Sequence, residues 1–213
     1  MDVPRISMLG LAEVANAAPG RKINKLKKYR FPRSEESVGR SNYYIKALSA
    51  IRRHHRGESG HVSSVLRELL ASARAEKNPL KRAKLLNNHR AITDYLKNFG
   101  ARALVIRPGK TLYYVYKDLV VSARPDLVAE ENGKLILVKL NLGKKDLAGG
   151  VCSTILHVLY EAANAQGLPI DSASVECLQA VSGSRITGPK SGFPDKRVLN
   201  SACQELLALW PAA

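Results

Sequence analysis

The sequence has few cysteines and no long apolar run. Its three cysteines, Cys152, Cys177 and Cys203, lie far apart and form neither a CxxC pair nor a His/Cys cluster at zinc-ligand spacing. This spacing argues against a disulfide framework and a structural zinc site, and it fits the reducing cytoplasm. No segment has the apolar length of a membrane span, and the first twenty residues do not resemble a signal peptide. We therefore expect a cytoplasmic protein with no membrane partner.

Two common catalytic motifs are also missing from the sequence. The basic stretch GRKINKLKK lacks the glycine spacing and the terminal Lys-Ser/Thr of a phosphate-binding loop. No Ser-centred elbow of the α/β-hydrolase type is present. The sequence therefore gives no support to a P-loop nucleotide hydrolase or to a serine hydrolase of that kind.

Acidic residues are scarce, with 18 Asp and Glu against 34 Lys and Arg, so the formal net charge is +16. The excess is uneven, because residues 1–100 hold 21 basic and 8 acidic residues whereas residues 101–213 hold 13 and 10. A basic first half beside a nearly neutral second half suggests a polyanion-binding region attached to a separately organised core. We expect a nucleic-acid partner, DNA ahead of RNA, with a protein partner or a homodimer as the alternative.

The first half has the pattern of a basic helical region. Apolar residues recur at helical spacing in residues 6–17, 41–55 and 61–76, and Asn78-Pro79 marks a boundary. We expect residues 1–78 to form a mostly helical unit that contacts nucleic-acid phosphates. The basic residues expected to do so are Arg21, Lys22, Lys25, Lys27, Lys28, Arg30, Arg33, Arg52, Arg53 and Arg56.

The second half, residues 79–213, has the pattern of a sheet domain. Residues 80–99 predict a helix, and the runs ALVIR, TLYYVYKDLVV, ARPDLVAE and KLILVKLNL predict strands. A helix after Gly149-Gly150, a strand at SVECLQAVSG and a final helix over residues 197–210 follow. The expected order is α-β-β-β-α-β with a trailing helix. The fold class is mixed α/β (α+β), with one central mixed sheet of about four strands flanked by helices.

The stretch ARPDLVAEENGKLILVKLNL, residues 123–142, places Asp126 on one expected strand and Lys139 on the next. This arrangement resembles the PD-(D/E)XK nuclease superfamily, including its RecB-like members, whose motif is Pro-Asp followed by an acid, any residue and a lysine. Pro125-Asp126 matches the first part. Lys139 matches the end of the second part, but Leu137 replaces its acid. The resemblance covers roughly residues 80–183 and implies a restriction-endonuclease-like core.

In this superfamily the two acids hold Mg²⁺ and the lysine positions or activates the attacking water. The resemblance thus implies that Asp126 is a metal ligand and that Lys139 is catalytic. Residues i and i+2 of a strand share a face, so Leu137 puts an apolar group where a ligand would stand. Glu161, on the following helix, and Glu130, on the strand face of Asp126, are the candidate replacements.

Three interpretations of this sequence remain open. The core is a catalytically degenerate nuclease fold that binds nucleic acid, or it is an active Mg²⁺-dependent nuclease with a relocated acid. Alternatively, the sheet domain is a non-enzymatic interaction subunit or adaptor, in which Asp126 and Lys139 form a structural ion pair. A magnesium cofactor is expected only for the active nuclease.

Overall fold

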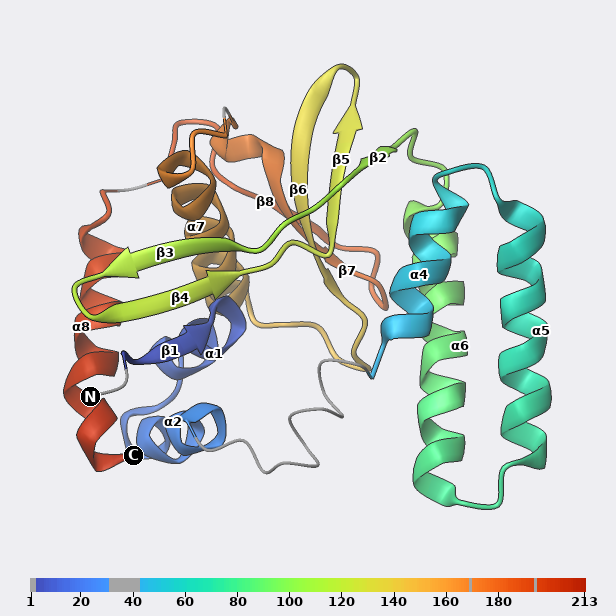
Figure 1. The fold of residues 1–213 in the computed structure, drawn as a ribbon, viewed down its shortest axis with the longest axis horizontal. Helices are drawn as coiled ribbons and strands as arrows, with labels where there is room; N and C mark the ends of the chain where they lie inside the picture. Colours follow the sequence, from blue (N-terminus) through green and yellow to red (C-terminus); the bar gives the residue numbers. More distant parts are fainter. Residues whose placement is uncertain (1–2, 31–42, 169, 194) are drawn as a thin grey trace.

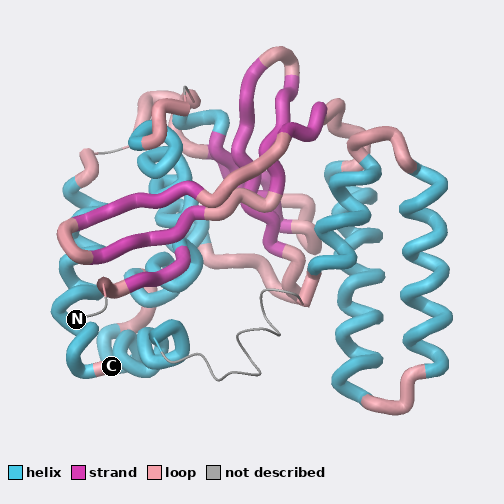
Figure 2. Tube along the Cα trace, in the orientation of Figure 1, coloured by secondary structure: helices cyan, strands magenta, loops and turns pink. Residues whose placement is uncertain are grey.

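The computed structural model describes residues 3–30, 43–168, 170–193 and 195–213. In this part of the chain the fold is α+β, with a five-stranded and a three-stranded sheet lying between two groups of helices (Figures 1 and 2). The helices are α1 (Met8–Ala15), α2 (Lys22–Arg30), α4 (Ile45–His54), α5 (Ser59–Ala75), α6 (Pro79–Phe99), α7 (Gly149–Ala165) and α8 (Arg197–Leu209). The strands are β1 (Arg5–Ser7), β2 (Val105–Arg107), β3 (Leu112–Tyr116), β4 (Leu119–Ala123), β5 (Leu127–Glu131), β6 (Lys134–Asn141), β7 (Val175–Gln179) and β8 (Arg185–Thr187).

The larger sheet, in the order β2-β5-β6-β7-β8, separates two hydrophobic clusters. Strand residues alternate between the two faces of a sheet. Accordingly, Ile136, Val138 and Leu140 of β6 join the bundle cluster, which they share with α4, α5 and α6. Leu137 joins the α7 cluster, which also contains the three-stranded sheet, α1 and α8. Figure 1 shows α4, α5 and α6 on one side of the larger sheet and α7 and the smaller sheet on the other.

The described residues among the first 78 are divided between these two sides. Strand β1 pairs in parallel with β4, and α1 packs against α7. By contrast, α4 and α5 pack against α6, and the bundle cluster runs from Ala47 to Ala180. Both clusters therefore cross the expected boundary at residues 78 and 79. The reason is that α6, which begins there, completes a helical bundle with the elements before it.

The expected α+β class, with a central mixed sheet flanked by helices, is confirmed, but the described residues form eight strands in two sheets instead of about four in one. The run TLYYVYKDLVV is a hairpin, since Tyr116 pairs with Leu119 across a two-residue turn in which Lys117 has a φ of 49°. Turns of this kind usually carry Gly or Asn, and Lys117-Asp118 has neither, so no local signal predicted the hairpin. Ile6 and Ser7 were expected to begin a helix, but they belong to strand β1. The side chain of Ser7 accepts a hydrogen bond from the backbone N–H of Gly10 and so caps α1. The expected order is present in the larger sheet as α6-β2-β5-β6-α7-β7, with the β3–β4 hairpin inserted.

Local signals explain the elements that were predicted well. The side chain of Asn78 accepts hydrogen bonds from the backbone N–H groups of Leu80 and Lys81, and Pro79 occupies the first turn of α6. Asn132 and Gly133 have φ values of 51° and 75°, which is the conformation of a two-residue hairpin turn.

None of the helices in the described ranges combines the length and the apolar character needed to cross a bilayer.

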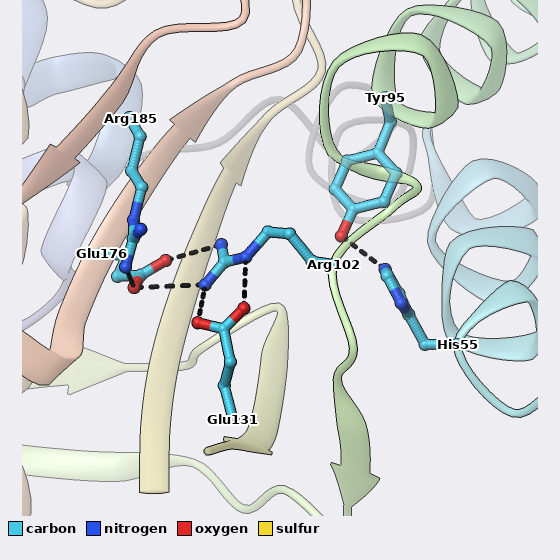
Figure 3. Close-up of polar contacts among 6 residues, drawn as sticks. All are labelled: His55, Tyr95, Arg102, Glu131, Glu176 and Arg185. Atoms are coloured by element: carbon cyan, nitrogen blue, oxygen red, sulfur yellow. Dashed lines mark hydrogen bonds and ion pairs between the residues drawn. The ribbon is translucent and has the colours of Figure 1, made fainter. Parts of the chain in front are cut away.

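An ion-pair network holds the strand ends of the larger sheet to the segment after α6 (Figure 3). Arg102 donates to both carboxylate oxygens of Glu131, at 2.9 and 2.7 Å, and to those of Glu176, at 2.8 and 3.3 Å. Arg185 donates to Glu176 at 2.5 Å. The hydrogen bonds from Arg102 lower the pKa of Glu131. Because the Glu176 side chain is 0% exposed, its charge depends on these two arginines.

A neighbouring contact lies within the bundle, where His55 Nε2 is 2.8 Å from the hydroxyl of Tyr95 (Figure 3). Burial, and then the proximity of His54, lower the pKa of His55 to about 4. Burial raises the pKa of Tyr95. His55 is therefore neutral at pH 7 and accepts the hydrogen bond from the Tyr95 hydroxyl, which fixes the end of α4 against α6.

Replacing Arg102 by Met should destabilise the protein strongly, because it leaves the Glu176 carboxylate buried with one partner on an exposed side chain. We expect a loss of about 3–5 kcal/mol in the free energy of unfolding, measured by urea denaturation. The matched control is Arg53→Met, which breaks the exposed Arg53–Glu58 pair and should cost less than about 1 kcal/mol. Equal losses in the two variants would show that the buried network does not carry this stability.

Candidate nucleic-acid interface

The chain passes from the smaller to the larger sheet at Arg124-Pro125. Strand β4 ends at Ala123, where it pairs with β3 and not with β6. Proline has no backbone N–H, so it cannot continue a hydrogen-bonded ladder. Pairing with β6 resumes one residue later, where Asp126 N donates to the carbonyl of Val138 at 2.8 Å. Asp126 therefore stands at the junction of the two sheets.

Asp126 and Lys139 lie side by side on neighbouring strands. The Nζ of Lys139 is 2.8 Å from Oδ2 of Asp126, and the same oxygen accepts from the backbone N–H of Leu140 at 2.9 Å. Arg52, from α4, donates through Nε and Nη2 to the Asp126 carbonyl at 3.2 and 2.7 Å. The carboxylate is thus compensated by one lysine and one amide, and the bundle is tied to the strand junction.

The two acids proposed as replacements for the motif acid are engaged elsewhere. Glu130 lies four residues beyond Asp126 on β5, about 13 Å along an extended strand, and accepts from Arg107 at 2.6 Å. Glu161 is 2.8 Å from Lys196 Nζ and 3.7 Å from His157 Nε2. These partners of Glu161 come from α7 itself and from the start of α8. Over the described ranges, no group of three or more His, Cys, Asp or Glu side chains is placed to hold a metal ion.

Leu137 is part of the hydrophobic core. Its side chain is 1% exposed and belongs to the α7 cluster with Ile155 and Val175. Its strand neighbour Lys139 shares the same face but is partly exposed beside Asp126. The face therefore changes from core to polar between positions 137 and 139.

The basic residues predicted from the first half have different surroundings. Lys22 pairs with Glu205, Lys25 with Glu13 and Arg53 with Glu58, while Arg30 donates to the carbonyl of Trp210. The exposed ones are Arg21, Lys27, Lys28 and Arg56. Arg33 lies outside the described residues. Of the ten, the structure brings Arg52 and Arg56 to the junction that carries Asp126.

A recess of about 130 Å³ opens beside this junction. Four arginines line it, from three separate segments: Arg52 in α4 and Arg56 in the turn after it, Arg107 at the end of β2, and Arg124 between β4 and β5. Asp126 contributes the only carboxylate of the lining residues. We call this site the arginine recess. A larger space of about 480 Å³ near the β5–β6 turn has one lysine and one aspartate, and so lacks this concentration of charge.

No family model matches the sequence, and no curated protein matches it.

Two of its four arginines, Arg107 and Arg124, were not singled out from the sequence. Both precede a proline, in RPG and RPD, and an Arg-Pro step at the end of a strand was the signal available. Their convergence depends on the antiparallel pairing of Arg107 with Val128, which brings β2 beside the start of β5.

Restoring the motif acid with Leu137→Glu should destabilise the protein, because it buries a carboxylate in the α7 cluster. We expect the free energy of unfolding to fall by at least about 3 kcal/mol. The control Leu137→Met conserves volume and should cost less than about 1.5 kcal/mol. Thermal and urea denaturation measure both changes. A Leu137→Glu variant as stable as Leu137→Met, with new Mg²⁺-dependent cleavage of DNA, would show instead that this position belongs to a decayed metal site.

Proposed function

We propose that this protein binds nucleic acid through phosphate contacts centred on the arginine recess. The observation that supports this most directly is the convergence of four arginines from three segments of the chain on one small space. Guanidinium groups bind phosphate oxygens through paired, charge-assisted hydrogen bonds. Concentrating four such groups is electrostatically costly for the free protein, and an anion relieves that cost.

The charge of the whole protein supports a polymeric anion. A formal net charge of +16 attracts a nucleic acid over distances comparable to the Debye length and speeds its association. Lys27 and Lys28 on α2, and Arg21 directly before it, add exposed cations. The contacts are to phosphates, so the proposed binding is insensitive to base sequence.

The protein binds without cleaving in this proposal. Asp126 is compensated by Lys139 and the Leu140 amide, and Glu130 and Glu161 are held by other cations. A restriction-endonuclease-like core with its second acid replaced by Leu137 would keep the phosphate contacts and lose the metal cage. DNA is the preferred ligand to test first, with RNA beside it.

Binding to single- and double-stranded DNA should weaken steeply with salt. Each neutralised phosphate contributes a slope of about −0.9 for duplex or −0.7 for single strands in a plot of log K against log salt concentration. Fluorescence anisotropy between about 50 and 200 mM salt measures this slope. The double variant Arg56→Gln/Arg124→Gln should weaken binding and reduce the slope by about one to two units, since it removes two cations of the arginine recess.

The matched control for this double variant is Arg53→Gln. It removes a cation from the last turn of α4 that lies outside the recess and pairs with Glu58. It should leave the slope nearly unchanged. Weak binding that hardly responds to salt would rule out the nucleic-acid proposal and favour a protein partner.

A metal-dependent nuclease is the second candidate, and the 2.8 Å contact between Asp126 and Lys139 on neighbouring strands favours it. If the first proposal is correct, linear, circular and single-stranded DNA and RNA should all remain intact with Mg²⁺ or Mn²⁺. Cleavage that is abolished by Asp126→Ala and by Lys139→Ala would establish the nuclease instead. Retention of that cleavage in Glu161→Gln would exclude the acid on α7 as the relocated ligand.

A further inference from the structure

The arginine recess is small. Its volume of about 130 Å³ is well below the range of about 300–1,000 Å³ found for pockets that enclose a drug-sized molecule. The recess is therefore suited to a small anionic group such as a phosphate and not to the enclosure of a larger ligand.

The walls of the recess are held in place by the backbone. Pro108 and Pro125 restrict the two segments that carry Arg107 and Arg124. A Cβ atom at Gly109 would lie 3.0 Å from Val128 Cγ2, so glycine allows this loop to approach β5 closely. Arg52 is fixed by its two hydrogen bonds to the Asp126 carbonyl. The recess is therefore largely formed before any ligand arrives.

Two of the arginines are free to face a ligand. Arg107 is paired with Glu130, and Arg52 uses two donors on Asp126. The guanidinium groups of Arg56 and Arg124 are exposed and make no hydrogen bond or ion pair with any other residue that the structure describes. Their guanidinium N–H donors are therefore available to a ligand.

The lining carries more positive charge than an internal phosphodiester needs. Four arginines and Asp126 give a formal charge of +3, and this charge is unchanged when the ion-pair partners Glu130 and Lys139 are both included. An internal phosphodiester carries a single negative charge, whereas a phosphomonoester carries about −1.5 to −2 at neutral pH. A phosphomonoester therefore neutralises more of the recess charge than an internal phosphodiester does.

We propose that the arginine recess binds the terminal phosphate of a nucleic-acid strand, so that the protein prefers strand ends that carry a phosphomonoester. This inference rests on the proposed nucleic-acid binding and adds the group that is recognised. Arg56 and Arg124 bind the terminal oxygens, Arg52 and Arg107 supply the surrounding positive charge, and the exposed cations of α2 lie outside the recess.

The test compares oligonucleotides of one sequence with an internal fluorophore that differ only in their ends: 5′-phosphate, 3′-phosphate, hydroxyl at both ends, or a closed circle. Binding to the full-length protein is measured by anisotropy in EDTA, so that no strand is cut. We expect one phosphorylated end to bind at least about tenfold more tightly than the hydroxyl and circular forms. Arg124→Gln should abolish this preference, and Arg53→Gln should retain it. Circular dichroism and thermal melting check that both variants fold.

Equal affinity for phosphorylated, hydroxyl and circular strands, with the steep salt dependence intact, would overturn the terminal-phosphate inference and leave the proposed function standing. Absence of binding to every oligonucleotide would overturn both. Inorganic phosphate and a nucleoside monophosphate are added as competitors. If either competes as well, at equal concentration, as the phosphorylated oligonucleotide, the recess is a site for small phosphates and the preference for strand ends is refuted.

Discussion

The buried carboxylate of Glu176 constrains much of this structure. It lies on a central strand with no exposure to solvent, so its charge must be compensated within the protein. Arg185 reaches it from the edge strand β8, and Arg102 reaches it from the segment that links the bundle to β2. Since Arg102 also holds Glu131 at the end of β5, one guanidinium fixes the helical bundle, the β5–β6 hairpin and β7 relative to one another.

The arginine recess depends on the same arrangement. Arg52 and Arg56 come from the bundle, whereas Arg107 and Arg124 come from segments that flank β5. If the bundle shifted against the sheet, Arg52 would lose the Asp126 carbonyl and the four guanidinium groups would separate. The buried ion pairs therefore set the geometry of the exposed site without contributing a residue to it.

The features that could be predicted from the sequence were mostly those decided by neighbouring residues, such as helix starts and hairpin turns. Asn78-Pro79 begins a helix, Asn132-Gly133 turns a hairpin, and that hairpin register places Asp126 opposite Lys139. The Lys117 turn has no such signal. The recess depends on contacts between residues more than fifty positions apart, such as Arg52 with Asp126, which no local pattern reveals. Strand alternation put Leu137 on the face of Lys139, but only the packing of α7 makes that part of the face core.

The Asp126–Lys139 pair can be explained by charge compensation, without the metal chemistry that its sequence motif suggests. A bare carboxylate beside the arginine recess would repel a phosphate and cancel part of the arginine charge. Lys139 at 2.8 Å compensates that carboxylate, while Asp126 still offers its carbonyl to anchor Arg52. In the proposed phosphate site, Lys139 thus keeps Asp126 from repelling the anion, whether or not it ever activates a water. The Asp126–Lys139 pair resembles part of a nuclease motif, but its two charges cancel, so it can lie beside the proposed phosphate site without repelling the anion. That role needs no acid at position 137, where Leu137 is part of the core.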